Sequence, residues 1–114
     1  ATEIQQEKEV INKNVKPTEF EALVNKGEGQ VLDVRTPEEW TEGTIKGAQK
    51  MNFFDTDFTS QLEQLDKNKA VFVYCKAGGR SAKAAKQLAN KDFTVYNLIG
   101  GISAWKAEGK TIIK

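Results

Sequence analysis

Short apolar segments alternate along this chain with segments of helical periodicity, and this alternation constrains the fold more than any other feature. Several of the apolar segments, such as Ala70 to Tyr74, are apolar at nearly every position, which is typical of strands in a parallel sheet covered on both faces. We therefore expect an α/β protein with three α/β/α layers and a central, mainly parallel five-stranded sheet. The expected order is strand 10–15, helix 17–26, strand 30–34, a capping box at 36–39, strand 48–53, a short helix through Phe58, Leu62 and Leu65, strand 70–74, helix 81–90, strand 94–99, a glycine turn at 100–101 and helix 102–108.

The length and composition are those of one globular domain. The chain has 114 residues, of which 39% are hydrophobic and 29% are charged. Residues 1–9 are polar apart from Ile4, so we expect a flexible N-terminal extension there and a single domain over residues 10–114.

The composition also excludes several kinds of chemistry. The chain has no histidine, which excludes histidine metal ligands and a histidine general base, and its single cysteine excludes an internal disulfide. A net charge of +1 gives no reason to expect nucleic acid, and no apolar run is long enough to cross a membrane. We expect a monomer with no metal, no cofactor, no nucleic acid and no membrane partner. Ala1 at the start of the chain leaves the compartment open; we favour a cytoplasmic location but keep a periplasmic one if a signal peptide was removed.

The cysteine directly follows the most apolar expected strand. In parallel sheets, ligands bind at the carboxyl ends of the strands, so Cys75 lies at the expected site. The backbone amides of the turn after it can form a nest for an anion, with the start of a helix behind them. The residues of this turn are Lys76, Ala77, Gly78, Gly79, Arg80 and Ser81.

The turn has the composition of an anion site. Gly78 and Gly79 both permit positive φ, and Lys76 and Arg80 add positive charge. Such surroundings lower the pKa of a thiol from its usual value of about 8.5, so Cys75 can act as a nucleophile without a general base. Cys75 could instead be an inert core cysteine, and Lys76 and Arg80 could be ordinary surface cations. The position of Cys75 after a strand, beside glycines and cations, favours the reactive thiol.

Four segments together resemble the rhodanese-like sulfurtransferase superfamily, and its single-domain rhodaneses in particular. They are VLDVRTPEEW, TEGTIKGA, VFVYCKAGGRSAKAA and LIGGISAW. The resemblance implies a rhodanese-like fold and a thiosulfate sulfurtransferase in which Cys75 carries a persulfide and residues 76–81 bind substrate. The implied donor is thiosulfate or a similar sulfane compound, and the implied acceptor is cyanide, a small thiol or a protein thiol. Thr44 and Lys46 stand where the family usually has histidine and proline.

Other functions stay open beside this one. Related phosphatases place five residues between their cysteine and arginine, whereas four separate Cys75 from Arg80, which favours sulfur transfer over a small phosphatase or an arsenate reductase. A persulfide carrier or a protein-interaction module is the second hypothesis.

Residues outside the loop have expected supporting roles. Asp33 and Arg35 lie at the end of an expected central strand, and we expect them to support the loop region, with Arg35 paired to a carboxylate such as Glu39. We expect Trp40 and Trp105 to be core anchors.

Overall fold

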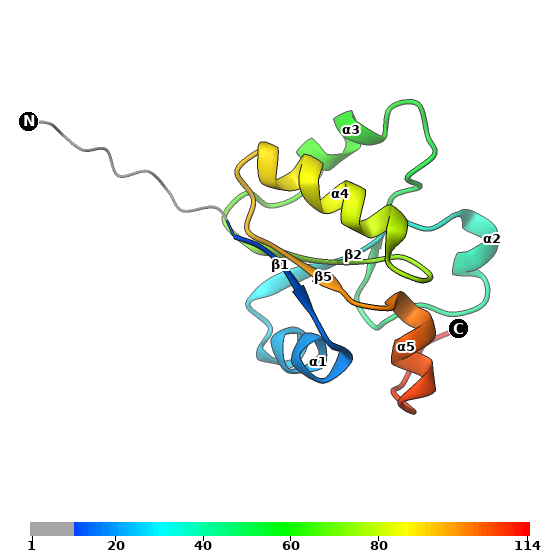
Figure 1. Ribbon diagram of the computed structural model, residues 1–114. Helices are drawn as coiled ribbons and strands as arrows, with labels where there is room; N and C mark the ends of the chain where they lie inside the picture. The colour runs from blue at the N-terminus through cyan, green and yellow to red at the C-terminus, as the bar shows by residue number, and fades with distance from the viewer. Residues whose placement is uncertain (1–10) are drawn as a thin grey trace, which may run out of the picture.

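The structure is a computed structural model that describes residues 11–114, so the expected N-terminal extension, residues 1–9, lies outside the described residues. Strands and helices follow the expected alternation (Figure 1). The elements are β1 (Asn12–Val15), α1 (Pro17–Lys26), β2 (Gly29–Asp33), α2 (Pro37–Trp40), β3 (Gln49–Lys50), α3 (Phe58–Gln61), the 3-10 helix η1 (Leu62–Gln64), β4 (Ala70–Tyr74), α4 (Gly79–Asn90), β5 (Val95–Leu98) and α5 (Gly101–Ala107).

The five strands form one sheet in the order β1-β5-β4-β2-β3, and every neighbouring pair is parallel. The α/β class is confirmed, and the sheet is entirely rather than mainly parallel. The central strand is β4, whose Tyr74 pairs in register with Asp33 of β2. The residue that follows β4 therefore lies at the middle of the carboxyl edge, where ligands bind in sheets of this kind.

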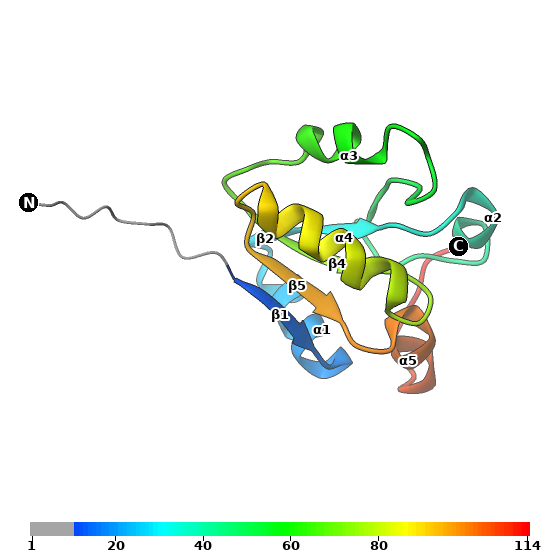
Figure 2. The same cartoon turned by 45° about the horizontal axis from the view of Figure 1, so that its top comes forward.

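Helices cover both faces of the sheet, which gives the three expected layers (Figures 1 and 2). Side chains alternate between the faces along β4. Val71 and Val73 pack with residues of α3, η1 and α4, whereas Phe72 and Tyr74 pack with residues of α1 and α5. Each face of the sheet thus has its own buried apolar cluster.

Aromatic rings fill the cluster under α1 and α5. Phe20 makes edge contacts with Phe72, Tyr74 and Trp105, at centroid distances of 6.2, 6.5 and 6.0 Å. Trp105 is buried, as expected of a core anchor. Trp40 is only half-buried and belongs to neither cluster, so the expectation that it anchors the core is wrong.

Two element boundaries differ from the expected ones for local reasons. β3 is shorter than 48–53 because Asn52 opens a turn, in which its side-chain oxygen accepts the amide of Phe54 at 2.9 Å. α4 begins at Gly79 rather than at Ser81, because Gly78 adopts φ 112° and is the N-cap. Over residues 11–114, we find no helix with the length and apolar character needed to span a membrane.

Candidate active site

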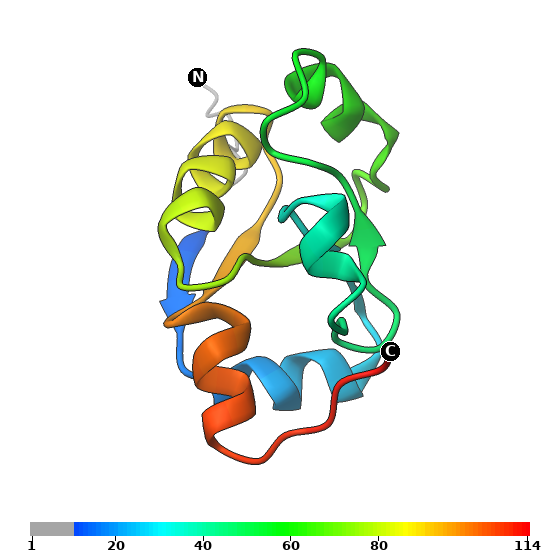
Figure 3. The same cartoon turned by 90° about the vertical axis from the view of Figure 1, so that its right-hand side faces the viewer.

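Cys75 lies in the loop between β4 and α4, at the carboxyl edge of the sheet. Figure 3 views this edge and shows the loop between the first turns of α4 and α5, with α2 beside it. Cys75 is 1% exposed, whereas Lys76, Ala77 and Gly79 are exposed. The thiol therefore lies at the bottom of the loop, and the residues that follow it form the rim.

Hydrogen-bond donors of the loop converge on the sulfur. The amide of Gly78 donates to Cys75 Sγ at 3.0 Å, and the hydroxyl of the buried Ser81 lies 3.4 Å from the same sulfur. That hydroxyl also lies 3.2 Å from the carbonyl oxygen of Gly78. Because a hydroxyl has a single proton, a negative charge on Sγ would draw that proton away from the carbonyl.

These donors decide the ionisation of the thiol. Burial of Cys75 disfavours the thiolate, but hydrogen bonds from the hydroxyl of Ser81 and from the amides of Ser81, Gly78 and Ala77 favour it more. The pKa of Cys75 is therefore lowered below that of an ordinary cysteine. Three of the six amides in the expected nest thus stabilise the charge on the sulfur.

We expect the thiol to react with iodoacetamide with a pH midpoint below the value of about 8.5 for a free cysteine. Replacing Ser81 by alanine removes one donor to the thiolate and should raise this midpoint by roughly one pH unit, because a hydrogen bond to a charged group contributes about 1.5 kcal/mol or more. Ser60→Ala, on the exposed surface of α3, is the matched control. A midpoint in the wild type at or above that of free cysteine would contradict the role of the loop donors.

Only one of the two loop glycines has the backbone conformation that requires glycine. Gly78 has φ 112°, whereas Gly79 is the first residue of α4, and an added Cβ there would meet nothing within 4 Å. The expectation that both glycines supply positive φ is therefore wrong for Gly79. The curl of the loop depends on Gly78.

Arg80 pairs with Glu39 of α2. Its Nη1 and Nη2 donate to the two carboxylate oxygens of Glu39 at 2.8 and 3.0 Å. The Glu39 carboxylate also accepts hydrogen bonds from the amide and the hydroxyl of Thr36, each at 3.0 Å. The expected capping box is therefore present, and it holds the same carboxylate that binds Arg80. The hydrogen bond from Arg80 is the main cause that lowers the pKa of Glu39 to about 2. Arg80 thus joins the loop to α2.

Arg35 pairs with Asp33 and not, as expected, with Glu39. Both side chains are buried, and Arg35 Nη2 donates to Asp33 Oδ2 at 2.8 Å and to the carbonyl oxygen of Gly43 at 2.7 Å. The guanidinium also lies over the Tyr74 ring, 5.6 Å from its centroid. The two residues are neighbours on one side of an extended segment, which explains why they pair with each other.

Asp33 and Arg35 lie on the opposite face of the sheet from the sulfur. Asp33 is in register with Tyr74, whose ring packs under α1 and α5, whereas Cys75 packs with α3 and α4. The pair therefore contacts the residue that precedes Cys75 rather than the loop donors. Tyr74 is also fixed by its hydroxyl, which accepts the amide of Ile45 at 3.0 Å.

The start of α5 holds the loop from the other side, which sequence reasoning missed. The amide of Ile102 donates to the carbonyl oxygen of Cys75 at 2.9 Å, and that of Ser103 to the carbonyl oxygen of Lys76 at 3.1 Å. Any Cβ on Gly101, which has φ 60°, would overlap these two carbonyl oxygens. The consecutive glycines 100 and 101 were the available signal, but they indicated only a turn.

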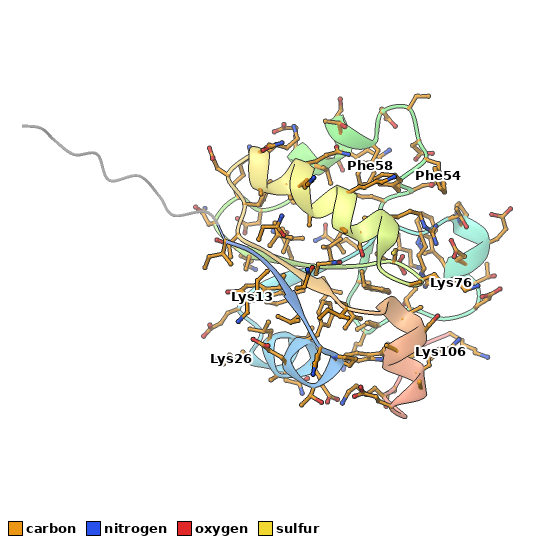
Figure 4. The ribbon with its side chains drawn as sticks, viewed as in Figure 1. Lys13, Lys26, Phe54, Phe58, Lys76 and Lys106 are labelled. Carbon is orange, nitrogen blue, oxygen red and sulfur yellow. The ribbon has the colours of Figure 1, made fainter. Side chains whose placement is uncertain are left out.

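Two exposed lysines lie on the side of the molecule that holds the loop. Figure 4 shows Lys76 of the loop and Lys106 of α5 on the same side of the molecule, at the carboxyl edge. Both residues are exposed. A groove of about 480 Å³ lies elsewhere, between α1 and the C-terminal segment, and none of its lining residues belongs to the Cys75 loop. That groove is therefore separate from the Cys75 loop.

Comparisons with known proteins cover both the sequence and the fold. A family model described as Rhodanese-like domain matches residues 16–108, which include the loop. The chain is 35% identical over 100 residues to thiosulfate sulfurtransferase GlpE of Coxiella burnetii, a match that covers 87% of this chain and 92% of that protein. It is also 35% identical over 100 residues to a tRNA uridine(34) hydroxylase of Cytophaga hutchinsonii, covering 84% of this chain but 32% of that protein. The crystal structure of a rhodanese-related protein of Thermoplasma volcanium superposes with a TM-score of 0.79 at 26% identity, covering 89% of this chain and 97% of that one.

Proposed function

The chain belongs to the rhodanese-like domain family, and we propose that it is a thiosulfate-type sulfurtransferase that works through a persulfide on Cys75. Relatives that match most of the chain are named as sulfurtransferases, which supports the general class. The loop geometry supports the finer assignment, because its donors converge on the sulfur of the single cysteine.

In the first half-reaction the Cys75 thiolate attacks the outer sulfur of thiosulfate. A bond forms between Sγ and that sulfur, the bond between the two sulfurs of thiosulfate breaks, and its electron pair leaves with sulfite. The negative charge moves to the outer sulfur of the new persulfide. The amide of Gly78 and the hydroxyl of Ser81 remain beside Cys75 as donors to the charged group.

In the second half-reaction an acceptor nucleophile takes the outer sulfur. Cyanide or a thiolate forms a bond to that sulfur, the bond to Sγ breaks, and its electron pair restores the Cys75 thiolate. The chain has one cysteine, so it cannot resolve the persulfide itself. The acceptor is therefore an external small molecule or a protein thiol.

The observation that carries this proposal is the separation between the sulfur and the arginine of the loop. Four residues lie between Cys75 and Arg80, and both terminal nitrogens of Arg80 are taken up by Glu39. A phosphatase or an arsenate reductase would need such an arginine to bind its oxyanion substrate. The geometry favours a small sulfur atom on Cys75 over a bound phosphate.

Lys76 supports thiosulfate as the donor. It is exposed at the rim, next to Cys75 in sequence, and it can attract a dianion to the mouth of the loop. The other residues of the loop, from Ala77 to Ser81, hold the persulfide through their backbone and the Ser81 hydroxyl.

Steady-state turnover separates an enzyme from a persulfide carrier. With thiosulfate and cyanide in excess, we expect thiocyanate to form continuously, many times per chain. A carrier or interaction module would release one thiocyanate per loaded chain and then stop. A burst of thiocyanate without continuous turnover would therefore reject the hypothesis of an enzyme and support that of a persulfide carrier.

A further inference from the structure

A phenylalanine is exposed on the turn that follows β3. Phe54 is 65% exposed, more than any other large apolar side chain that the structure places over residues 11–114. The neighbouring Phe53 packs against the buried Phe58, with ring centroids 5.2 Å apart. The chain thus packs the half-buried ring of Phe53 against the core and leaves the ring of Phe54 largely in solvent.

The turn holds Phe54 in this outward position. The amide of Phe54 donates to the side-chain oxygen of Asn52 at 2.9 Å, and the amide of Asp55 donates to the Asn52 carbonyl at 3.0 Å. The amide of Phe53 donates to the carbonyl oxygen of Val34 at 3.2 Å, just beyond the end of β2. The ring is therefore presented from a turn that is tied to the carboxyl edge of the sheet.

Arg80 connects Phe54 to the Cys75 loop. The guanidinium carbon of Arg80 lies 5.7 Å from the centroid of the Phe54 ring, while its nitrogens bind Glu39. Figure 4 shows Phe54 and Lys76 on the same side of the molecule. Phe54 thus packs beside Arg80, a residue of the Cys75 loop.

A single exposed apolar side chain needs no functional explanation by itself. Here the ring is fixed by a turn and by Arg80, beside the loop that must receive an external sulfur acceptor. Cyanide has no apolar surface to place against it, whereas an organic thiol has carbon atoms next to its sulfur. An exposed ring at this position favours the second kind of acceptor.

We propose that Phe54 is a specificity-determining residue that selects an organic thiol with apolar carbon beside its sulfur as the acceptor. This proposal rests on the proposed sulfurtransferase function and names the class of its acceptor. The acceptor thiolate forms a bond to the outer sulfur of the Cys75 persulfide anion, the bond to Sγ breaks, and its electron pair restores the Cys75 thiolate. The outer sulfur leaves on the acceptor as a persulfide anion, so atoms and charge balance without a further reactant.

Two acceptors that differ only in apolar length test the proposal. 2-Mercaptoethanol and 6-mercaptohexanol both carry a thiol and a hydroxyl, and sulfite release from thiosulfate measures the rate with each. We expect the wild type to prefer 6-mercaptohexanol in kcat/KM, and Phe54→Ala to reduce the ratio of the two kcat/KM values about fivefold, the scale of a partly exposed apolar contact. Phe54→Leu, which keeps an apolar side chain, should retain most of the preference.

Ile11→Ala is the matched control, because Ile11 is exposed by 39% at the start of the sheet, on the edge opposite the loop. It should leave the ratio unchanged. An unchanged ratio in Phe54→Ala, or an equal fall with both thiols, would overturn the role of Phe54, since a disturbed Arg80 would affect every acceptor alike. A wild type that takes no sulfur from thiosulfate or polysulfide would instead reject the proposed function, and the role of Phe54 would fall with it.

Discussion

Replacing Cys75 by serine is expected to abolish sulfur transfer, with turnover falling by about three orders of magnitude or more. A serine hydroxyl does not ionise near neutral pH and cannot carry the transferred sulfur as a persulfide. The loop donors beside Sγ would have no thiolate to stabilise. Thiocyanate formation from thiosulfate and cyanide measures the loss.

The fold should tolerate this substitution. Serine is close to cysteine in size, and its hydroxyl could accept the amide of Gly78 that now binds Sγ. The urea midpoint of Cys75→Ser should therefore stay near that of the wild type. Turnover that survives in a folded Cys75→Ser variant would show that another group carries the sulfur.

Replacing Asp33 by alanine is expected to cost about 3–5 kcal/mol of the free energy of unfolding, because it leaves the charge of Arg35 buried without its partner. Asp33 has no exposed surface and Arg35 is 3% exposed, so water cannot take the place of the carboxylate. The loss is large compared with the total stability of a small domain. Urea unfolding at neutral pH measures it.

Two further variants test the cause of that loss. Lys13→Ala breaks an ion pair with Glu19 whose side chains are about half exposed, at 57% and 49%, and should cost less than about 1 kcal/mol. The double variant Asp33→Ala with Arg35→Met removes both buried charges and should recover part of the stability lost in Asp33→Ala. If Asp33→Ala cost no more than Lys13→Ala, the buried pair would not stabilise the fold as the geometry implies.

The sequence allowed the architecture to be predicted because its signals are local. The apolar run before Cys75 marks the central strand, and alternation of strands and helices requires parallel pairing. The capping box of Thr36 and Glu39 follows from residue types three positions apart, and the structure contains it. The position of Cys75 at the carboxyl edge follows from the same signals.

The partners within the site could not be predicted, since they are far apart in sequence. Glu39 and Arg80 meet across 41 residues, whereas the sequence suggested Arg35 as the partner of Glu39. The Gly101 contact with the loop likewise requires α5 to return to the end of β4. Chain topology, which no local pattern contains, decides these contacts.

The predicted start of α4 was wrong for a different reason. Its N-cap is Gly78 in a left-handed conformation, without the side-chain hydrogen bond that usually marks a helix start. Ser81, the expected first residue of this helix, instead places its hydroxyl near the sulfur and the Gly78 carbonyl oxygen. The same serine that suggested a helix boundary is thus one of the donors of the site.

The most direct test of the account is the intact mass of the protein after incubation with thiosulfate. The account predicts a gain of one sulfur atom per chain, removed by cyanide and absent in Cys75→Ser. A chain that gains no sulfur from thiosulfate or from polysulfide, while its Cys75 is still free to react with iodoacetamide, would contradict the persulfide mechanism.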